Sequence, residues 1–295
     1  MNAFKLRFLG AMSIFGTIGI FVRAIPLSPA AIACFRGAVG CLFLLTFMAV
    51  TGKKLCWADI KRNLLLLLLS GAAIGVNWIL LFEAYKYTTI AIATVCYYMA
   101  PVLLVLASPL VGERLAPRRL ACIAVALLGL TCVSGVLKGS LPSGSELMGL
   151  ALGIGAAVLY ASVMLLNKKI GQIAPYDKTV VQLGAAAMVV LPYLLLTGGC
   201  DLSAMTGGAW MLLLIVGIVH TGIAYTLYFG ALQKLSAQTA AVFSYIDPVA
   251  AVLLSALLLK ESLDLLSIIG AILVLGSALY SELPERKPRK NLKKT

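Results

Sequence analysis

The sequence predicts an all-α integral membrane protein with ten transmembrane helices, arranged as two inverted five-helix repeats. Three observations support this prediction. Of the 295 residues, 61% are hydrophobic and only 12% are charged, whereas soluble domains carry about 25% charged residues. The apolar residues fall in runs that can cross a bilayer, for which about 20 residues suffice. Two of these runs contain the same proline-centred pattern, half a chain apart.

Turn-forming residues such as Pro26 and Pro117 divide the apolar runs. The first five runs form an expected repeat over residues 1–138, the next five form a second repeat over 144–282, and residues 283–295 form a basic cytoplasmic tail. The expected spans are residues 6–25, 29–50, 63–84, 88–111, 117–137, 146–167, 176–197, 209–232, 237–258 and 264–281.

Lys and Arg are unevenly divided between the two sides of the predicted membrane. With the amino terminus inside, nineteen of them lie in inner segments and four in outer segments. Because basic residues accumulate in cytoplasmic loops, this bias predicts a multi-pass protein of the cell inner (plasma) membrane with both termini in the cytoplasm. The net charge of +13 is therefore a topology signal, with membrane lipid rather than nucleic acid as the expected partner.

Two proline-centred patterns mark the most unusual helices. Tyr97-Tyr98-Met99-Ala100-Pro101 lies within the fourth span, and Ser244-Tyr245-Ile246-Asp247-Pro248 lies within the ninth. Proline has no N–H and its ring clashes with the preceding turn, so it bends or breaks a helix. Matching helix faults in the two halves indicate a transport site at the interface between repeats.

Further matches support a repeat with inverted topology. Residues 77–84 align with 224–231, and Glu113 aligns with Glu261 after a slip of one residue. Since each half contains an odd number of spans, the second half starts from the opposite side of the membrane. Such a repeat provides alternating access when its halves exchange conformations.

The runs from Asn77 to Leu115 and from His220 to Leu263 resemble the two halves of EamA-type proteins in the drug/metabolite transporter superfamily. Phe35-Arg36-Gly37 fits the same resemblance, which covers essentially the whole chain. It implies a central cavity lined mainly by the third, fourth, eighth and ninth spans. It also implies export or exchange of small metabolites. Members often carry an acidic residue before the second-half proline, as Asp247 does here.

Asp247 is the leading candidate for substrate or proton binding. An ionisable residue in mid-membrane costs about 2.5–3.5 kcal/mol on insertion scales, so it is usually retained for a function. The alternative is a protonated carboxyl that braces the bend at Pro248. The full set of candidate substrate-binding residues is Asp247, Tyr245, Ser244, Asn77, Trp78, Tyr97, Tyr98, His220, Tyr225 and Tyr228.

The other candidates also admit two interpretations each. The tyrosines and Trp78 predict an aromatic box for a ring or an ammonium group, or else hydroxyl bonds between helices. His220, the only histidine, titrates near neutral pH or serves in packing. Asn77 lines the cavity or bonds a neighbouring helix. For Arg36 we favour a structural role over binding of a substrate carboxylate.

Four residues are expected to act in gating or helix bending, namely Pro101, Pro248, Glu113 and Glu261. The sequence contains no phosphate-binding loop, metal-ligand cluster or nucleophile triad, so we expect no cofactor, no metal and no enzymatic activity.

Two rival functions would need other features in the sequence. A membrane-embedded enzyme acting on lipids or isoprenoids requires an acidic pair or a histidine cluster, and a channel requires a ring of like charges or carbonyls.

The sequence therefore predicts a secondary transporter or exchanger, and by resemblance an exporter, of small metabolites such as amino acids or amines. Protons are a candidate coupling ion because of Asp247 and His220. Whether the protein acts as a monomer or a homodimer is left open.

Overall fold

A computed structural model describes residues 2–87, 93, 96–113, 116–133, 146–197, 200–250 and 265–282. Within these ranges every regular element is a helix, in agreement with the predicted all-α class. The helices are α1 (Ala3–Arg23), α2 (Pro29–Val50), α3 (Trp57–Tyr87), α5 (Ala100–Leu106), α6 (Pro117–Val133), α7 (Glu146–Lys169), α8 (Pro175–Leu196), α9 (Gly207–Ile215), α10 (Ala224–Leu232), α11 (Ala237–Ser244) and α13 (Leu265–Glu282), with a 3-10 turn η1 (Ser108–Val111) and a π-helix η3 (Val216–Ile223).

Several helix starts follow from capping residues in the sequence. The Ser28 hydroxyl accepts a hydrogen bond from the Ala31 amide, and proline at position 29 fits the first helical turn. Thr206 and Ser236 cap α9 and α11 in the same way. These caps accept hydrogen bonds from amides that otherwise lack a partner at the start of a helix. Loss of such a cap lowers the stability of the protein by about 1 kcal/mol.

One helix starts well before its expected bound, and another expected span changes its helical geometry. α3 begins at Trp57, earlier than the expected start at residue 63, with Asp59 in its first turn, where a carboxylate interacts favourably with the helix dipole. The expected span 209–232 is a helix throughout, but η3 interrupts its α-geometry.

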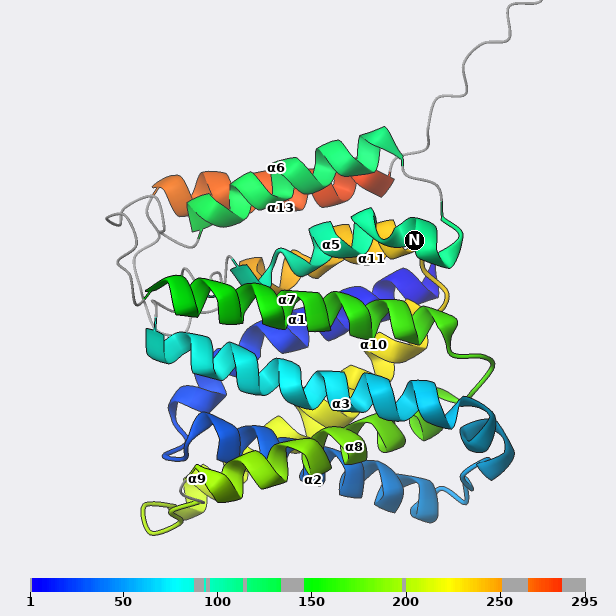
Figure 1. Ribbon diagram of the computed structural model, residues 1–295, viewed down its shortest axis with the longest axis vertical. Coiled ribbons are helices and arrows are strands. Elements are labelled where there is room, and N and C mark those ends of the chain that lie inside the picture. Colours follow the sequence, from blue (N-terminus) through cyan, green and yellow to red (C-terminus); the bar gives the residue numbers. More distant parts are fainter. Residues whose placement is uncertain are drawn as a thin grey trace, which may run out of the picture.

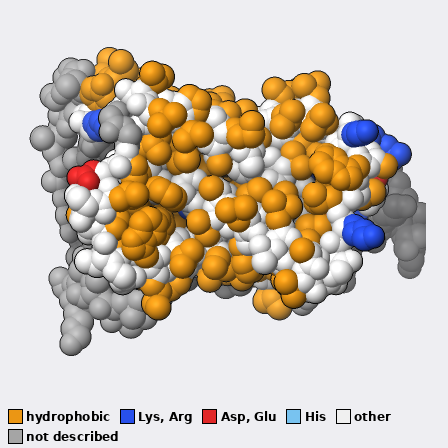
Figure 2. Space-filling view, turned by 90° about the horizontal axis from the view of Figure 1, so that it is seen from below, with side chains coloured by type: hydrophobic (Ala, Val, Ile, Leu, Met, Phe, Trp, Pro, Cys, Tyr) orange, Lys and Arg blue, Asp and Glu red, His pale blue; other side chains and the backbone are white. Residues whose placement is uncertain are grey.

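Six segments of the described chain are long and apolar enough to cross a membrane. They are Ala3–Val22, Pro29–Val50, Trp57–Ala84, Leu147–Lys169, Pro175–Leu196 and Gly207–Leu232. Figure 2 shows hydrophobic side chains over the middle of one face of the bundle, with charged side chains at its two ends. Exposed leucines such as Leu65 and Leu195 would be unfavourable in water and suit a lipid-facing surface.

The helices form a stack from α6 and α13 at one edge, through α5 and α11, to α2 and α8 at the other edge (Figure 1). α3 packs against α7 and α8, and α1 packs along α10. The start of α1 and the end of α13 lie at the same end of the bundle (Figure 1). We call this the basic end, and the residues that define it are Lys53, Arg118, Arg119, Lys168 and Lys234.

The two proline patterns coincide with breaks in the helices. α5 begins at Ala100 after a turn at Tyr98 and Met99. α11 ends at Ser244, and helical backbone resumes at residues 246–250 after Tyr245. Both breaks place a tyrosine three residues before the proline, in the interior of the bundle.

Close contact between α2 and η3 depends on glycine. A Cβ atom at Gly217 would lie 2.4 Å from Val39 Cγ1, and one at Gly40 would lie 3.0 Å from the Gly217 carbonyl oxygen. The Thr221 hydroxyl donates to the Val216 carbonyl five residues earlier, at 2.9 Å, which matches the spacing of a π-helix. Two helices thus approach closely beside the polar side chains at the centre of the bundle.

Candidate functional site

Aromatic side chains from several helices meet at the centre of the bundle. They come from α3, from the turn before α5, from α7, from α10 and from the turn after α11. We call them the central aromatic cluster, which consists of Trp78, Tyr97, Tyr98, Tyr160, Tyr225, Tyr228 and Tyr245.

The rings form a continuous series of contacts. Tyr97 and Tyr160 stack with ring centroids 5.3 Å apart and an interplanar angle of 7°. The Tyr228 hydroxyl lies 3.5 Å from the Tyr160 hydroxyl, and Tyr225 meets both Tyr228 and Trp78 edge-on at 6.3 Å. Phe15 of α1 adds a further edge contact to Tyr225, at 5.0 Å.

Asp247 lies against this cluster. Its side chain is deep in the bundle but keeps accessible surface, as Tyr97, Tyr160 and Tyr225 also do. The Asp247 carboxylate accepts a hydrogen bond from the Tyr98 side chain. Asp247 is thus a half-buried acid beside half-buried aromatic side chains. A carboxylate among aromatic rings suits a cationic group.

Tyr245 and Ser244 have structural partners. The Tyr245 hydroxyl donates to the Tyr98 carbonyl at 3.1 Å, and Tyr245 is fully buried. The Ser244 hydroxyl donates to the Ala240 carbonyl at 2.8 Å. Both hydroxyls therefore donate to backbone carbonyls near the helix breaks. From the sequence we expected these two residues to bind substrate.

Asn77 and His220 connect neighbouring helices. The Asn77 amide donates to the Ala156 carbonyl of α7 at 2.6 Å, which is the interhelix bond that the sequence left open. His220 Nε2 lies 2.6 Å from the Thr17 hydroxyl of α1. The same hydroxyl lies 2.7 Å from the Ile14 carbonyl, one turn earlier in α1.

Arg36 reaches the same region from α2. Its guanidinium lies 4.5 Å from the centre of the Trp78 ring, and its Nε donates to the Thr221 hydroxyl at 3.2 Å. The arginine is 8% exposed and lies within electrostatic range of Tyr97 and Tyr225. The guanidinium and the Asp247 carboxylate thus both lie near the central aromatic cluster, with Tyr225 as a shared neighbour.

A second polar group of residues joins the two halves at the basic end. Both oxygens of Glu113 accept from the Ala237 amide, at 2.7 and 2.8 Å, and so cap the start of α11. Lys168 pairs with the same carboxylate at 2.9 Å and also donates to the Leu235 carbonyl. Arg119 donates to Ser236 at 2.9 Å. Glu261, the expected counterpart of Glu113, lies outside the described residues, as does the tail at 283–295.

Comparison with known proteins identifies the family. Two segments of the chain, residues 6–135 and 147–281, match the EamA-like transporter family. The chain belongs to this family. It is therefore a multi-pass membrane protein of a transporter family.

Relatives of the EamA-like chain carry names that specify no substrate. The uncharacterized transporter YxxF of Bacillus subtilis is 31% identical over 93% of this chain and 88% of its own length. An uncharacterized transporter of Archaeoglobus fulgidus is 27% identical over 90% and 91% of the two chains. A protein of known crystal structure aligns with a TM-score of 0.84 over 95% of this chain and 96% of that chain. At 19% identity this likeness shows the fold alone.

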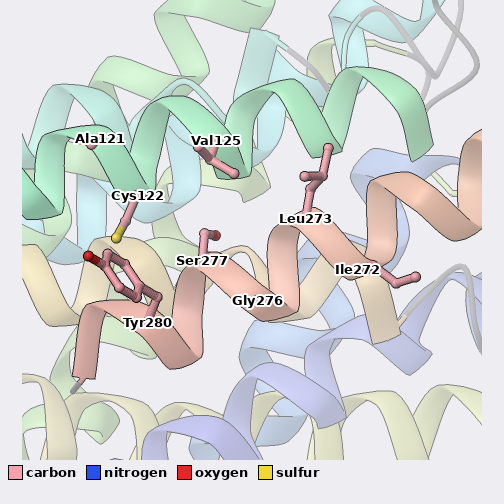
Figure 3. Close-up of a pocket in the computed structure, with 8 residues that line it drawn as sticks. All are labelled: Ala121, Cys122, Val125, Ile272, Leu273, Gly276, Ser277 and Tyr280. Atoms are coloured by element: carbon pink, nitrogen blue, oxygen red, sulfur yellow. The ribbon is translucent and has the colours of Figure 1, made fainter.

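A groove of about 280 Å³ lies apart from this site, between α6 and α13 at the edge of the EamA fold. Figure 3 shows its lining, with Cys122 and Val125 on α6 facing Ser277 and Tyr280 on α13. The lining is almost entirely apolar. Tyr280 is its one aromatic side chain, and no charged residue lines it.

Two site residues were missed or undervalued from the sequence. Tyr160 was not named, although it is a tyrosine in mid-span by the same criterion that selected Tyr97 and Tyr225. Arg36 was placed in a structural role, and its position among the aromatic rings requires the packing of α2 against η3. Within the described ranges no group of three His, Cys, Asp or Glu side chains could hold a metal ion.

Proposed function

We propose that this EamA-like protein is a secondary transporter or exchanger that exports small metabolites, such as amino acids or amines, by alternating access. The observation that carries the proposal is the half-buried Asp247 carboxylate beside a cluster of tyrosines from both halves. A carboxylate held deep in a membrane protein is favoured there only if it meets a cation or a proton. An ammonium group provides the charge, and the aromatic rings add cation–π attraction.

Alternating access is supported by the way the halves pack. α3 contacts α7 and α8, and the corresponding second-half segment from α9 to α10 contacts α1 and α2. Tyr98 and Tyr245, which touch each other, are separated by the same 147 residues as Pro101 and Pro248. These relations fit a pseudo-two-fold axis through the central site, as expected for ten spans in two inverted repeats.

The group at the basic end fits a closed cytoplasmic gate. Glu113 belongs to the first half, whereas Lys168 and the start of α11 belong to the second. Opening the site to the cytoplasm would separate these partners. The bias of basic residues supports a cytoplasmic location for this end and for both termini. The broken helices at Pro101 and Pro248 provide bending points near the site.

The first test is the thermal stability of the purified protein against a panel of amino acids and amines. A ligand at a hundredfold excess over its Kd stabilises the folded state by about 2.7 kcal/mol. We expect Asp247→Asn to abolish the shift while the protein remains folded. Asp201→Asn is the matched control, because Asp201 lies in an exposed loop and accepts a hydrogen bond from the Ser203 amide.

The result against this function is a panel that never shifts the melting temperature, with Asp247→Asn lowering the stability of the unliganded protein. Asp247 would then be a brace for the bend at Pro248.

Proton coupling is a separate part of the proposal, based on Asp247 and on His220, whose Nε2 bonds the Thr17 hydroxyl. The measurement is transport into vesicles with and without a pH gradient. We expect the rate to fall when the gradient is collapsed, and an unchanged rate would exclude protons as the coupling ion.

A further inference from the structure

We infer that Arg36 binds a carboxylate of the transported molecule, so that the site selects substrates that carry both an anionic and a cationic group. This inference rests on the proposed function, and it changes the role that the sequence alone favoured for Arg36. Its evidence is the set of partners around the guanidinium.

Among the described residues, only part of the guanidinium has a hydrogen-bond partner. One face lies over the Trp78 ring, at 4.5 Å from its centroid. The Nε donates to Thr221, whose own hydroxyl proton goes to the Val216 carbonyl at 2.9 Å. An arginine carries five N–H donors in a planar fork. Thr221 therefore takes one donor and leaves the terminal nitrogens, which are the part of the fork that binds a carboxylate with two parallel hydrogen bonds.

No carboxylate of the described residues lies within ion-pair distance of Arg36. The described ion pairs join Lys86 to Glu83 and Lys168 to Glu113. The titratable side chains within electrostatic range of Arg36 are Tyr97, Tyr225 and His220. A buried charge normally requires a counter-charge. In this position the counter-charge can arrive with the substrate.

Asp247 supplies the opposite charge in the same site. Tyr225 lies within electrostatic range of both Arg36 and Asp247, so both charged groups lie near one aromatic ring. The stacked rings of Tyr97 and Tyr160 form a wall nearby. A molecule with a carboxylate and an ammonium group can therefore place each charge against its complement and its side chain against the rings.

This arrangement also predicts which molecules bind poorly. An amine without a carboxylate leaves the fork of Arg36 unpaired, and a carboxylic acid without an amino group leaves Asp247 unpaired. Sites built to hydrogen-bond a substrate group discriminate strongly against analogues that lack it, because their own polar groups then stay unsatisfied.

The experiment measures Kd by thermal shift for the twenty common amino acids, and then for the decarboxylated amine and the deaminated acid of each amino acid that binds. For the wild-type protein we expect each amino acid to bind at least about tenfold tighter than either analogue, as for one charge-assisted hydrogen bond. Arg36→Gln should weaken amino acid binding about 10- to 100-fold and leave amine binding within about twofold.

Two further variants separate binding from folding. Arg36→Lys keeps the charge but loses the fork, so amino acid binding should fall to a value between those of the wild type and Arg36→Gln. Arg7→Gln is the matched control, since Arg7 also lies near an aromatic ring, Phe4, but at the start of α1, and it should change no Kd.

Amines that bind the wild type as tightly as amino acids, or an Arg36→Gln variant that weakens both classes equally, would overturn the inference and leave the proposed function standing. If none of the probes binds the wild-type protein, the inference and the proposed substrate class fail together.

Discussion

The ion pair between Lys168 and Glu113 should hold the basic end closed, and its removal should open that end measurably. Lys168 Nζ lies 2.9 Å from Glu113, and the two side chains are 12% and 20% exposed. A hydrogen bond between charged groups contributes about 1.5–3 kcal/mol, and residual solvent access reduces this to about 1–2 kcal/mol. In Lys168→Gln the population of the open gate should therefore rise about 5- to 30-fold.

Hydrogen–deuterium exchange at the Ala237 amide measures this opening. The Ala237 amide donates to Glu113, so it exchanges only when the gate opens, and its rate follows the open population. In Lys168→Gln we expect exchange of the peptide containing Ala237 to accelerate by that factor. Glu113→Ala should accelerate it further, because it also removes the acceptor for the Ala237 amide.

The matched control is Lys86→Gln. Lys86 and Glu83 form an ion pair at 2.6 Å within α3, with Lys86 64% exposed. The substitution keeps Glu83 and its hydrogen bond from Tyr193 of α8. Loss of the ion pair should leave exchange at Ala237 unchanged. Equal exchange in Lys168→Gln and the wild type would refute the gate, since the ion pair would then contribute nothing to closure.

Two other predictions concern stability of the folded protein. Gly217→Ala should lower the free energy of unfolding by about 1–3 kcal/mol, because its Cβ would overlap Val39. The control Gly19→Ala, whose Cβ would have no atom within 4 Å, should leave it unchanged. Equal thermal melts for the two variants would show that α2 and η3 can separate. Tyr245→Phe should lower the free energy of unfolding by about 1–3 kcal/mol, because it leaves the buried Tyr98 carbonyl without its donor. An unchanged thermal melt would mean that another donor replaces the hydroxyl.

The helix breaks before Pro101 and Pro248 and the all-α class could be predicted from the sequence, because both depend on residues that are neighbours along the chain. The apolar runs specify helices, and proline interrupts them wherever they pack, as at Tyr98 and Tyr245. The aromatic residues near these breaks could be selected because tyrosine is uncommon in mid-membrane. The basic loops likewise report on topology without any knowledge of packing.

The partners of the polar side chains could not be predicted, because they come from distant parts of the chain. η3 depends on the close approach of α2 through Gly40, and nothing within residues 216–223 alone requires a π-helix. The same contact brings Arg36 to Trp78 and Thr221. His220 and Asn77 were sound candidates by residue type, but only the packing of α1 and α7 shows what they bond.

The measurement that tests the central claim most directly is solute counterflow in liposomes that contain the purified protein. Liposomes are loaded with a mixture of unlabelled amino acids and amines, and entry of the same compounds with isotopic label is followed by mass spectrometry. Alternating access predicts that internal substrate accelerates entry of its labelled form above the level in empty liposomes, and that Asp247→Asn abolishes the effect. Labelled compounds that enter at the same rate with and without internal substrate would contradict alternating access and indicate a channel, and absence of entry for every compound would contradict the proposed substrates.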